Sequence, residues 1–422
     1  MTYRRRIIDA LLDEVFPHLT AVALEGAKGV GKTATGTQRA QSVTSLTDPN
    51  ERALLAADPS RVTKLPPPVL IDEWQLEPAV WDVVRRAVDD TSGGSRFLLA
   101  GSASVPPGTP IHSGAGRIVR VVMRPLAFAE RDLTQPTISL RALLDGTQGN
   151  ITGTSPVTLD DYANEIWRSG FPGIRDLPAR TRRLQLDSYL ARIVDRELPD
   201  SGVTIRRPAA LRAWLAAYGA ATATTASYTA ILNAATAGEV DKPARQTVAI
   251  YREHLTRIFV LDPIPAWAPV LAPLRRLSQA PKHHLVDPAL AAQLVGITPD
   301  DLLRGRGATD STAGSWLGAL FESLTAQSVR VYADAAEARV GHLRTSDTRH
   351  EIDLIVERGI SRTLAIEVKL SSTVDDHDVR HLHWLKAQLG DRLVDMIVVT
   401  TGKHAYRRPD GVAVIPLALL GP

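Results

Sequence analysis

Residues 22–40 read "VALEGAKGVGKTATGTQRA". A short apolar run is followed by a glycine-rich turn and then by a pattern typical of a helix. Gly26, Gly31, Lys32 and Thr33 fit the spacing G-x-x-x-x-G-K-[ST]. Glycines let backbone N–H groups curl around phosphate oxygens, and the start of a helix adds its positive dipole. The stretch therefore predicts a strand, a phosphate-binding loop and a helix, as at the start of an α/β fold.

This loop is predicted to bind a nucleoside triphosphate through consecutive residues. They are Gly26, Ala27, Lys28, Gly29, Val30, Gly31, Lys32 and Thr33. The ammonium of Lys32 would reach the β- and γ-phosphates, and the hydroxyl of Thr33 would be a ligand of Mg²⁺. ATP and Mg²⁺ are therefore the expected cofactors.

Two further strand ends carry polar residues that suit nucleotide hydrolysis. In "PPPVLIDEWQLEPAVWDVVRRAV" (66–88), an apolar strand ends at Asp72 and Glu73. Asp72 would hold the hydrated Mg²⁺, and Glu73 would polarise the attacking water. Ser102 ends the next apolar strand, in "SRFLLAGSAS" (95–104), and is placed to sense the γ-phosphate. The alternative for Ser102 is an ordinary turn at the exit of a strand.

The segment "GAGRIVRVVMRPLAFAERDL" (114–133) completes this part of the chain. The order of its motifs, with "LAGSAS", "GAGR" and "RPLAFAE", resembles a family of bacterial and archaeal AAA-type ATPases. Ala127 stands where that family more commonly has serine. The resemblance implies ATP hydrolysis and a homo-oligomer. It also implies that Arg117 contacts nucleotide, either in its own chain or in a neighbouring subunit, because a guanidinium suits the developing phosphate charge.

Composition narrows the remaining choices. The chain has 422 residues, 44% of them hydrophobic, and no cysteine, which excludes disulfides and thiolate metal sites. The N-terminal stretch lacks the apolar segment of a signal peptide, and no run approaches the length of a membrane span. We therefore expect a cytoplasmic protein with no membrane partner. The net charge of +3 comes without a basic block, so any DNA contact must depend on local arrangement.

Changes in composition and in hydrophobic pattern along the chain predict three domains, with boundaries at 1–140, 155–300 and 310–422. The Gly/Thr-rich residues 143–161 and the loose stretch 296–314 are interpreted as linkers. The middle domain is expected to be helical, with a part like a winged helix at residues 242–267. There a helix would turn Val248, Tyr251, Leu255 and Ile258 inward and be followed by a strand-like wing. Its polar face would either contact DNA or merely face solvent.

The C-terminal region places charged residues within regular elements. Glu322 lies in the helical pattern of residues 315–333, and Asp353 lies in a strand of the predicted hairpin 342–359. In "TLAIEVKLSS" (363–372), Glu367 and Lys369 are two residues apart and so project from one face of a strand. The order of these elements resembles the PD-(D/E)XK nuclease fold, which includes restriction enzymes and Holliday-junction resolvases. Ile352 stands where the family name has proline.

The resemblance implies a metal-dependent phosphodiester hydrolysis. Glu322, Asp353 and Glu367 would hold a divalent metal, and hard oxygen ligands favour Mg²⁺ or Mn²⁺. Asp353, Glu367 and Lys369 would be the catalytic residues, with Lys369 orienting the water or neutralising charge. One alternative is a solvated strand face with a Glu–Lys pair. Another is a nuclease fold that binds DNA without cutting it.

The predicted fold class is thus α/β: a P-loop AAA-type ATPase domain, a helical middle domain and a restriction-endonuclease-like C-terminal domain. The expected function is an ATP-hydrolysing DNA-processing protein coupled to a nuclease-like domain. An ATPase that responds to branched or forked DNA without cleaving it is the first alternative. A nucleotide-dependent signalling switch that binds protein partners is the second.

Overall fold

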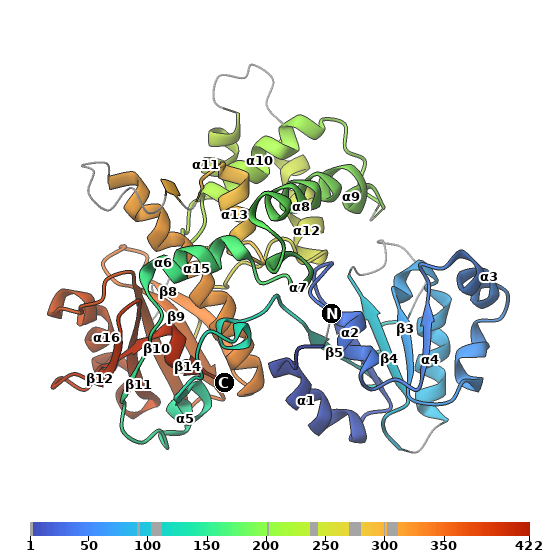
Figure 1. The fold of residues 1–422 in the computed structure, drawn as a ribbon, viewed down its shortest axis with the longest axis horizontal. Helices are drawn as coiled ribbons and strands as arrows, with labels where there is room; N and C mark the ends of the chain where they lie inside the picture. The colour runs from blue at the N-terminus through green and yellow to red at the C-terminus, as the bar shows by residue number, and fades with distance from the viewer. Residues whose placement is uncertain are drawn as a thin grey trace. The chain divides into compact units, whose positions relative to one another are not determined.

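The computed structural model describes residues 3–90, 93–102, 112–200, 202–236, 244–269, 280–298, 300–301 and 311–422. The chain forms two compact units that interleave along the sequence (Figure 1). Unit 1 contains residues 1–125, 192–206 and 249–260, and unit 2 contains residues 126–191, 207–248 and 261–422. These units are a division by packing. The three domains with boundaries at 1–140, 155–300 and 310–422 stay a prediction.

Unit 1 is built on a five-stranded parallel sheet with the order β2-β3-β4-β1-β5. The strands are β1 (Ala21–Glu25), β2 (Ser42–Ser45), β3 (Val69–Asp72), β4 (Phe97–Gly101) and β5 (Ile118–Val122). Every residue of β3 and β4 is buried, as expected for parallel strands that helices cover on both faces. The predicted α/β fold with a parallel sheet at the N-terminus is confirmed.

The helices of unit 1 lie on both faces of this sheet (Figure 1). They include α1 (Ile7–Val15), α2 (Lys32–Thr37), α3 (Pro49–Ala57) and α4 (Ala79–Asp89). Successive strand residues sort into two apolar cores, because side chains alternate across a strand. Val22 and Leu24 pack in the core that contains Leu12 of α1, whereas Ala21 and Ala23 pack in the core of α4.

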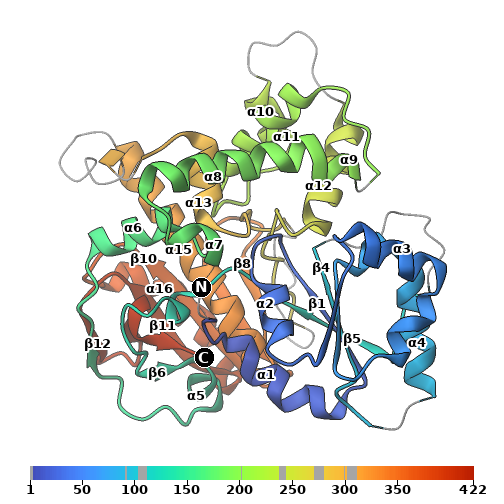
Figure 2. The same cartoon turned by 45° about the vertical axis from the view of Figure 1, so that its right-hand side comes forward.

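Unit 2 contains a seven-stranded mixed sheet with the order β7-β12-β13-β11-β10-β9-β8. Its strands are β7 (Gly153–Thr154), β8 (Arg339–Arg344), β9 (Glu351–Arg358), β10 (Arg362–Lys369), β11 (Leu393–Thr400), β12 (His404–Arg407) and β13 (Ala413–Pro416). Strand β10 pairs antiparallel with β9 and parallel with β11. The long helix α15 (Ser311–Ala335) precedes β8, and α16 (Asp376–Leu389) joins β10 to β11 (Figure 2). The elements therefore follow in the order predicted from the sequence.

Residues 143–161 are not the loose linker that their composition predicts. Helix α5 (Leu140–Asp145) packs against β10 and β11, and β7 pairs with β12 at the edge of the seven-stranded sheet. Just before them, β6 (Ile138–Ser139) pairs with β14 (Leu420–Gly421) at the end of the chain. Gly and Thr were interpreted as linker residues, but an edge strand of two residues needs little apolar surface because its partner supplies the hydrogen bonds.

The remaining elements are mainly helical. They include α6 (Leu159–Arg168), α7 (Pro172–Arg175), α8 (Ala179–Arg192), α9 (Leu198–Asp200), α10 (Pro208–Ala220), α11 (Tyr228–Ala235), α12 (Arg245–Arg257) and α13 (Pro288–Val295). The residues Val248, Tyr251, Leu255 and Ile258 are buried, as their helical spacing predicts. The predicted wing is not confirmed. After α12, Leu261 and Ile264 form isolated antiparallel bridges to Leu285 and Lys282, and Ala266 forms a parallel bridge to His342, so the winged helix stays a prediction.

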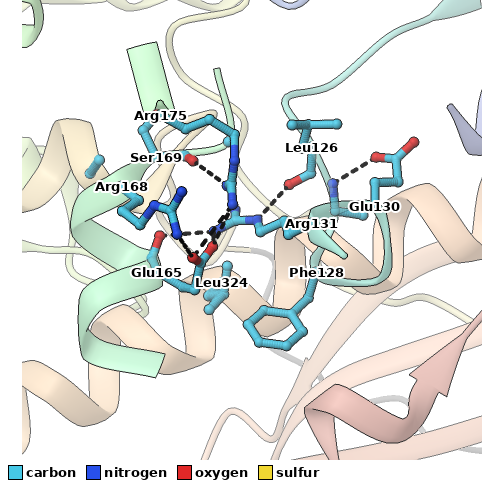
Figure 3. A network of polar contacts seen from close by, with 12 residues as sticks. Leu126, Phe128, Glu130, Arg131, Glu165, Arg168, Ser169, Arg175 and Leu324 are labelled. Atoms are coloured by element: carbon cyan, nitrogen blue, oxygen red, sulfur yellow. Dashed lines mark hydrogen bonds and ion pairs between the residues drawn. The ribbon is translucent and has the colours of Figure 1, made fainter. Parts of the chain in front are cut away.

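A buried polar network ties the start of unit 2 together (Figure 3). Glu165 of α6 accepts hydrogen bonds from Arg131 at 3.3 Å and from Arg175 at 3.1 Å, and all three side chains are at most 3% exposed. Arg131 also donates to the backbone oxygen of Leu126. The "PLAFAERD" segment, which the sequence analysis joins to the nucleotide-binding part, is therefore anchored in unit 2.

Replacing Glu165 by glutamine is expected to lower the free energy of unfolding by about 3–5 kcal/mol, because two buried guanidinium groups lose their shared carboxylate. Arg168→Ala is the matched control: it contacts the same carboxylate at 3.2 Å, but its side chain is 40% exposed. The control should cost no more than about 1 kcal/mol. Denaturant unfolding followed by tryptophan fluorescence measures both, and equal losses would contradict the assignment.

Candidate nucleotide site and C-terminal carboxylate cluster

The P-loop, residues 26–33, joins the end of β1 to α2 at the carboxyl edge of the parallel sheet. Gly26 adopts φ +154°, and a Cβ there would lie 2.1 Å from the backbone oxygen of Met123. Gly31 caps α2 with φ +104°. The positive φ favours glycine at both positions, and at Gly26 a side chain would also lack space.

Lys32 holds its ammonium inside this loop. Its Nζ donates to the backbone oxygens of Gly26 at 2.8 Å and Ala27 at 2.9 Å. Burial lowers the pKa of Lys32 to about 8. These two carbonyls accept two of its three N–H donors but supply no formal negative charge. Phosphate oxygens would supply that charge, so the geometry suits an anionic ligand.

Thr33 and Asp72 form the pair of oxygens that Mg²⁺ would need. The hydroxyl of Thr33 donates to Oδ1 of Asp72 at 2.8 Å, across from the end of β3. Burial raises the pKa of Asp72. A hydroxyl and a carboxylate at this separation are hard oxygen donors beside the phosphate loop, and these residues fit the ion.

Glu73 and Ser102 meet at the neighbouring strand ends. Glu73 has a left-handed backbone with φ +54°, which turns its side chain away from the strand direction. Ser102, at the end of β4, donates to Oε2 of Glu73 at 3.3 Å, and Gln75 donates to the same oxygen. The structure therefore brings Lys32, Thr33 and these acidic and hydroxyl groups to one edge of the sheet.

Arg117 lies at the opposite ends of these strands, where their amino ends meet. Ile118, the next residue, pairs with Ala21 at the start of β1, whereas the P-loop follows the end of β1 at Glu25. Five residues of strand separate the two edges by about 16 Å. Arg117 pairs with Asp89 at 2.6 Å instead. The prediction that Arg117 contacts nucleotide of its own chain is therefore wrong, and contact with a neighbouring subunit's nucleotide stays a prediction.

Two contacts to the P-loop were missed by the sequence analysis. Lys28 pairs at 2.6 Å with Glu197, which ends a π-helical turn (Ile193–Glu197). The buried guanidinium of Arg6 donates to the backbone oxygens of Val30 and Arg124. Neither gives a local sequence signal, because Glu197 is 169 residues from Lys28 and Arg6 stands in a basic run that is typical of a surface.

In unit 2, the predicted C-terminal site residues come together around β9 and β10. Asp353 accepts a hydrogen bond from the backbone N–H of Val368 at 2.9 Å. Glu367 is buried, and its Oε2 lies 3.7 Å from the ammonium of Lys369. Lys369 is also 3.7 Å from Asp378 of α16. The strand face with Glu367 is therefore not solvated, because Ala365 on that face packs with residues of α16.

Lys282 stands at the centre of the carboxylate cluster, which we define as Glu322, Glu351, Asp353 and Glu367. Its Nζ lies 2.8 Å from Oε1 of Glu322 and 2.8 Å from Oδ1 of Asp353. Oε1 of Glu351 is 3.4 Å away, and the lysine side chain is 1% exposed. Lys282 gives no sequence signal, since "APKHHLVD" (280–287) carries no motif and lies far from the C-terminal strands in the sequence.

Lys282 sets the charge of its neighbours. Burial would lower the pKa of Lys282, but Asp353, Glu322 and Glu351 raise it well above the usual value. Burial would raise the pKa of Asp353, and the Lys282 ammonium outweighs it, so the pKa of Asp353 is lowered. Burial and the Asp353 carboxylate raise the pKa of Glu322 to about 8 and that of Glu367 well above its usual value. The cluster is therefore neutralised internally.

The carboxylate cluster does not fit the divalent metal that the nuclease resemblance implies. A metal ligated by Glu322 and Asp353 would share their oxygens with the Lys282 ammonium, at the same place and with charge of the same sign. The predicted roles of Glu322, Asp353 and Glu367 as metal ligands are thus opposed by a residue that the motifs did not include.

His284 gives an acid-stability prediction. Both of its ring nitrogens are buried without a hydrogen-bond partner in the described part of the chain. Burial and the nearby Lys282 charge lower the pKa of His284 from 6.5 to about 3. As pH falls below about 6.5, His284 binds a proton in the unfolded state but not in the folded state. Through His284, wild type should lose about 2 kcal/mol of unfolding free energy between pH 7 and pH 5 that His284→Gln does not lose. Exposed His18→Gln should show the wild-type change, as unfolding of the three proteins at both pH values will show.

Comparison with known proteins supports part of this organisation. Residues 19–131 match an AAA domain. Residues 159–301 and 317–420 match two domains of unknown function, DUF8612 and DUF4143. Lys282 thus falls in the first of these matches, and the carboxylate cluster in the second. Among the described residues, no helix is long and apolar enough to cross a membrane.

The chain is also similar over almost its whole length to two mycobacterial proteins. They are uncharacterized protein Rv2008c of Mycobacterium tuberculosis and uncharacterized protein Mb2031c of Mycobacterium bovis. Each is 26% identical over 424 residues, which cover 99% of this chain and 84% of the relative. The names of these relatives state no activity, so the indication of nucleotide binding and hydrolysis comes from the match of residues 19–131 to an AAA domain.

Proposed function

We propose that the protein is a DNA-dependent ATPase whose C-terminal domain has a nuclease-like fold and binds DNA without cleaving it. The observation that carries the ATPase part is the assembly of Lys32, Thr33, Asp72, Glu73 and Ser102 at the carboxyl edge of one parallel sheet. In open α/β sheets ligands bind at this edge, because the loops that follow the strands converge there.

Each residue has a distinct part in this proposal. Backbone N–H groups of the P-loop and the ammonium of Lys32 bind the phosphates. Thr33 and Asp72 hold Mg²⁺, which supplies charge neutralisation of the β- and γ-phosphates when it is bound. Glu73 orients and polarises the attacking water, and its hydrogen bond with Ser102 fixes the carboxylate close to the end of β4.

DNA is proposed as the partner because of the C-terminal domain. Its helix, hairpin, strand, helix and strand follow the order of the PD-(D/E)XK resemblance, and Asp353, Glu367 and Lys369 lie together as that resemblance implies. This arrangement supports a metal-dependent nuclease as the second candidate. The Lys282 ammonium between Glu322 and Asp353 favours the non-cleaving alternative.

A homo-oligomer is part of the proposal. Arg117 lies too far from its own P-loop to serve it, so a role in hydrolysis requires a neighbouring subunit. Arg117→Ala should then lower ATP turnover only where the protein is an oligomer. Turnover by a monomer should not depend on Arg117. Light scattering together with turnover at several protein concentrations tests this point.

The experiment that tests the proposal is ATP turnover over a panel of single-stranded, duplex, forked and four-way DNA at low salt. Low salt is chosen because electrostatic DNA binding is strongest there. We expect one DNA structure to stimulate phosphate release, and Lys32→Ala to abolish it. Equal stimulation by all structures would remove the branch-specific version. The absence of any DNA affinity would overturn the DNA part and favour a nucleotide-dependent switch that binds proteins.

A further inference from the structure

The carboxylate cluster of unit 2 surrounds a positive charge that belongs to the chain itself. We infer that this cluster is a cation site whose occupant is the Lys282 ammonium, and that a divalent metal binds there only when that ammonium is removed. The inference concerns unit 2 alone and does not depend on ATP hydrolysis or on DNA binding.

Carboxylate oxygens from separate elements converge on one point. Glu322 comes from α15, whereas Asp353 and Glu351 come from β9. The Nζ of Lys282 lies 2.8 Å from Glu322, 2.8 Å from Asp353 and 3.4 Å from Glu351. Carboxylates that converge from different elements are the arrangement that proteins use for Mg²⁺ or Mn²⁺. In this chain the arrangement is the same, but the cation is the ammonium of Lys282.

The backbone of Lys282 holds the amine in place. Lys282 and Ile264 exchange two backbone hydrogen bonds of 2.9 Å each. On the same segment, His283 donates to Thr224 at 2.8 Å and the backbone oxygen of His284 accepts from Asp262 at 3.0 Å. Backbone pairing with two other segments thus holds the Cα of Lys282 beside the cluster, and its side chain is 1% exposed.

Charge opposes a metal that would bind beside this amine. A divalent ion at the same oxygens would place like charges within a few ångströms in a buried environment, where their repulsion is only weakly screened. Asp353 is also bound on its second oxygen by the N–H of Val368. In the wild-type cluster, both oxygens of Asp353 are therefore already bound, one by the Lys282 ammonium and one by the N–H of Val368.

One carboxylate oxygen of the cluster has no hydrogen-bond partner while Lys282 occupies the site. Oε1 of Glu367 is buried and has no hydrogen-bond partner in the described part of the chain. Glu367 neighbours Asp353, which contributes to its raised pKa. Without Lys282, Glu322, Asp353 and Glu367 would supply a set of hard oxygen ligands with an unpaired oxygen already directed at the interior.

The test is Mn²⁺ binding by the nucleotide-free full chain, measured by electron paramagnetic resonance. Without nucleotide, the phosphates that complete the metal site of the P-loop are missing. Asp375, His377 and the half-buried Asp378 lie close enough together to bind an ion by themselves, so only a signal that Asp353→Asn removes is counted. Wild type should show no such signal, whereas Lys282→Ala should gain one bound Mn²⁺ that Lys282→Ala/Asp353→Asn loses.

Lys369→Ala is the matched control, because it removes the other lysine beside Glu367 but not the ammonium between Glu322 and Asp353. It should gain no Mn²⁺. A folded Lys282→Ala that binds no more Mn²⁺ than wild type would overturn the inference, and so would Asp353-dependent binding in wild type.

The loss of Lys282 leaves buried carboxylates without a counter-charge, so folding needs its own measurement. The melting temperature of Lys282→Ala should rise on addition of Mn²⁺, and that of wild type should not change. Should Lys282→Ala fail to fold in every condition, wild type and Asp353→Asn decide the matter. Equal Mn²⁺ binding by the two supports the inference, and weaker binding by Asp353→Asn overturns it. The Mn²⁺ measurement does not involve ATP turnover, so failure here is distinct from failure of the proposed function.

Discussion

Glu73→Gln is expected to keep ATP bound and to lower the rate of hydrolysis about 10²- to 10⁴-fold. The amide has almost the shape of the carboxylate and can still accept from Ser102 Oγ, which lies 3.3 Å from Oε2 in wild type. It cannot take a proton from the attacking water. ATP affinity should therefore change little, because the groups that bind phosphate and Mg²⁺ remain.

Single-turnover phosphate release and equilibrium binding of a fluorescent ATP analogue separate the two quantities. Glu77→Gln is the matched control: it removes a carboxylate four residues on, at the end of the short helical turn Trp74–Leu76. The control should hydrolyse ATP at the wild-type rate. An unchanged rate in Glu73→Gln would show that another group activates the water.

Lys32→Ala is expected to lose ATP binding and, with it, turnover. The ammonium is buried and is held by backbone carbonyls that cannot neutralise it, so phosphate is its natural partner. Charge-assisted hydrogen bonds of this kind contribute about 1.5–3 kcal/mol, or roughly 10- to 150-fold in affinity. Turnover should fall further, because the same charge stabilises the transferring phosphoryl group.

Lys28→Ala is the control within the same loop. Lys28 is half exposed and already paired with Glu197, so its removal should alter ATP affinity only a few-fold. Isothermal titration of each variant with ATP and Mg²⁺ gives the comparison. A larger loss in Lys28→Ala than in Lys32→Ala would contradict the assignment of the phosphate-binding lysine.

The nucleotide site was predictable because its information is local. Glycines, Lys32 and Thr33 stand at fixed spacing in one loop, and Asp72, Glu73 and Ser102 each follow an apolar strand. In a parallel sheet the ends of such strands meet at one edge, so short patterns were enough to bring distant residues together. Arg117 failed by the same rule, since it precedes its strand and therefore lies at the other edge.

Lys282 could not be predicted because its partners are distant in the sequence. Its spacing from Glu322 and Asp353, 40 and 71 residues, reflects tertiary packing and no local period. The predicted wing stays unconfirmed, because residues 261–266 form isolated bridges, two of them to residues 282–285 and one to His342. Similarly, residues 153–154 read as a linker because edge pairing with β12 leaves no apolar pattern.

In our proposal, the P-loop hydrolyses ATP while the C-terminal domain leaves DNA intact. Phosphate release and DNA integrity can be followed in one reaction, with Mg²⁺, ATP and four-way DNA, for wild type and Lys32→Ala. We expect phosphate release by wild type only, with uncut DNA in both reactions. Equal phosphate release by the two proteins, or DNA cut by wild type and spared by Asp353→Asn, would contradict it.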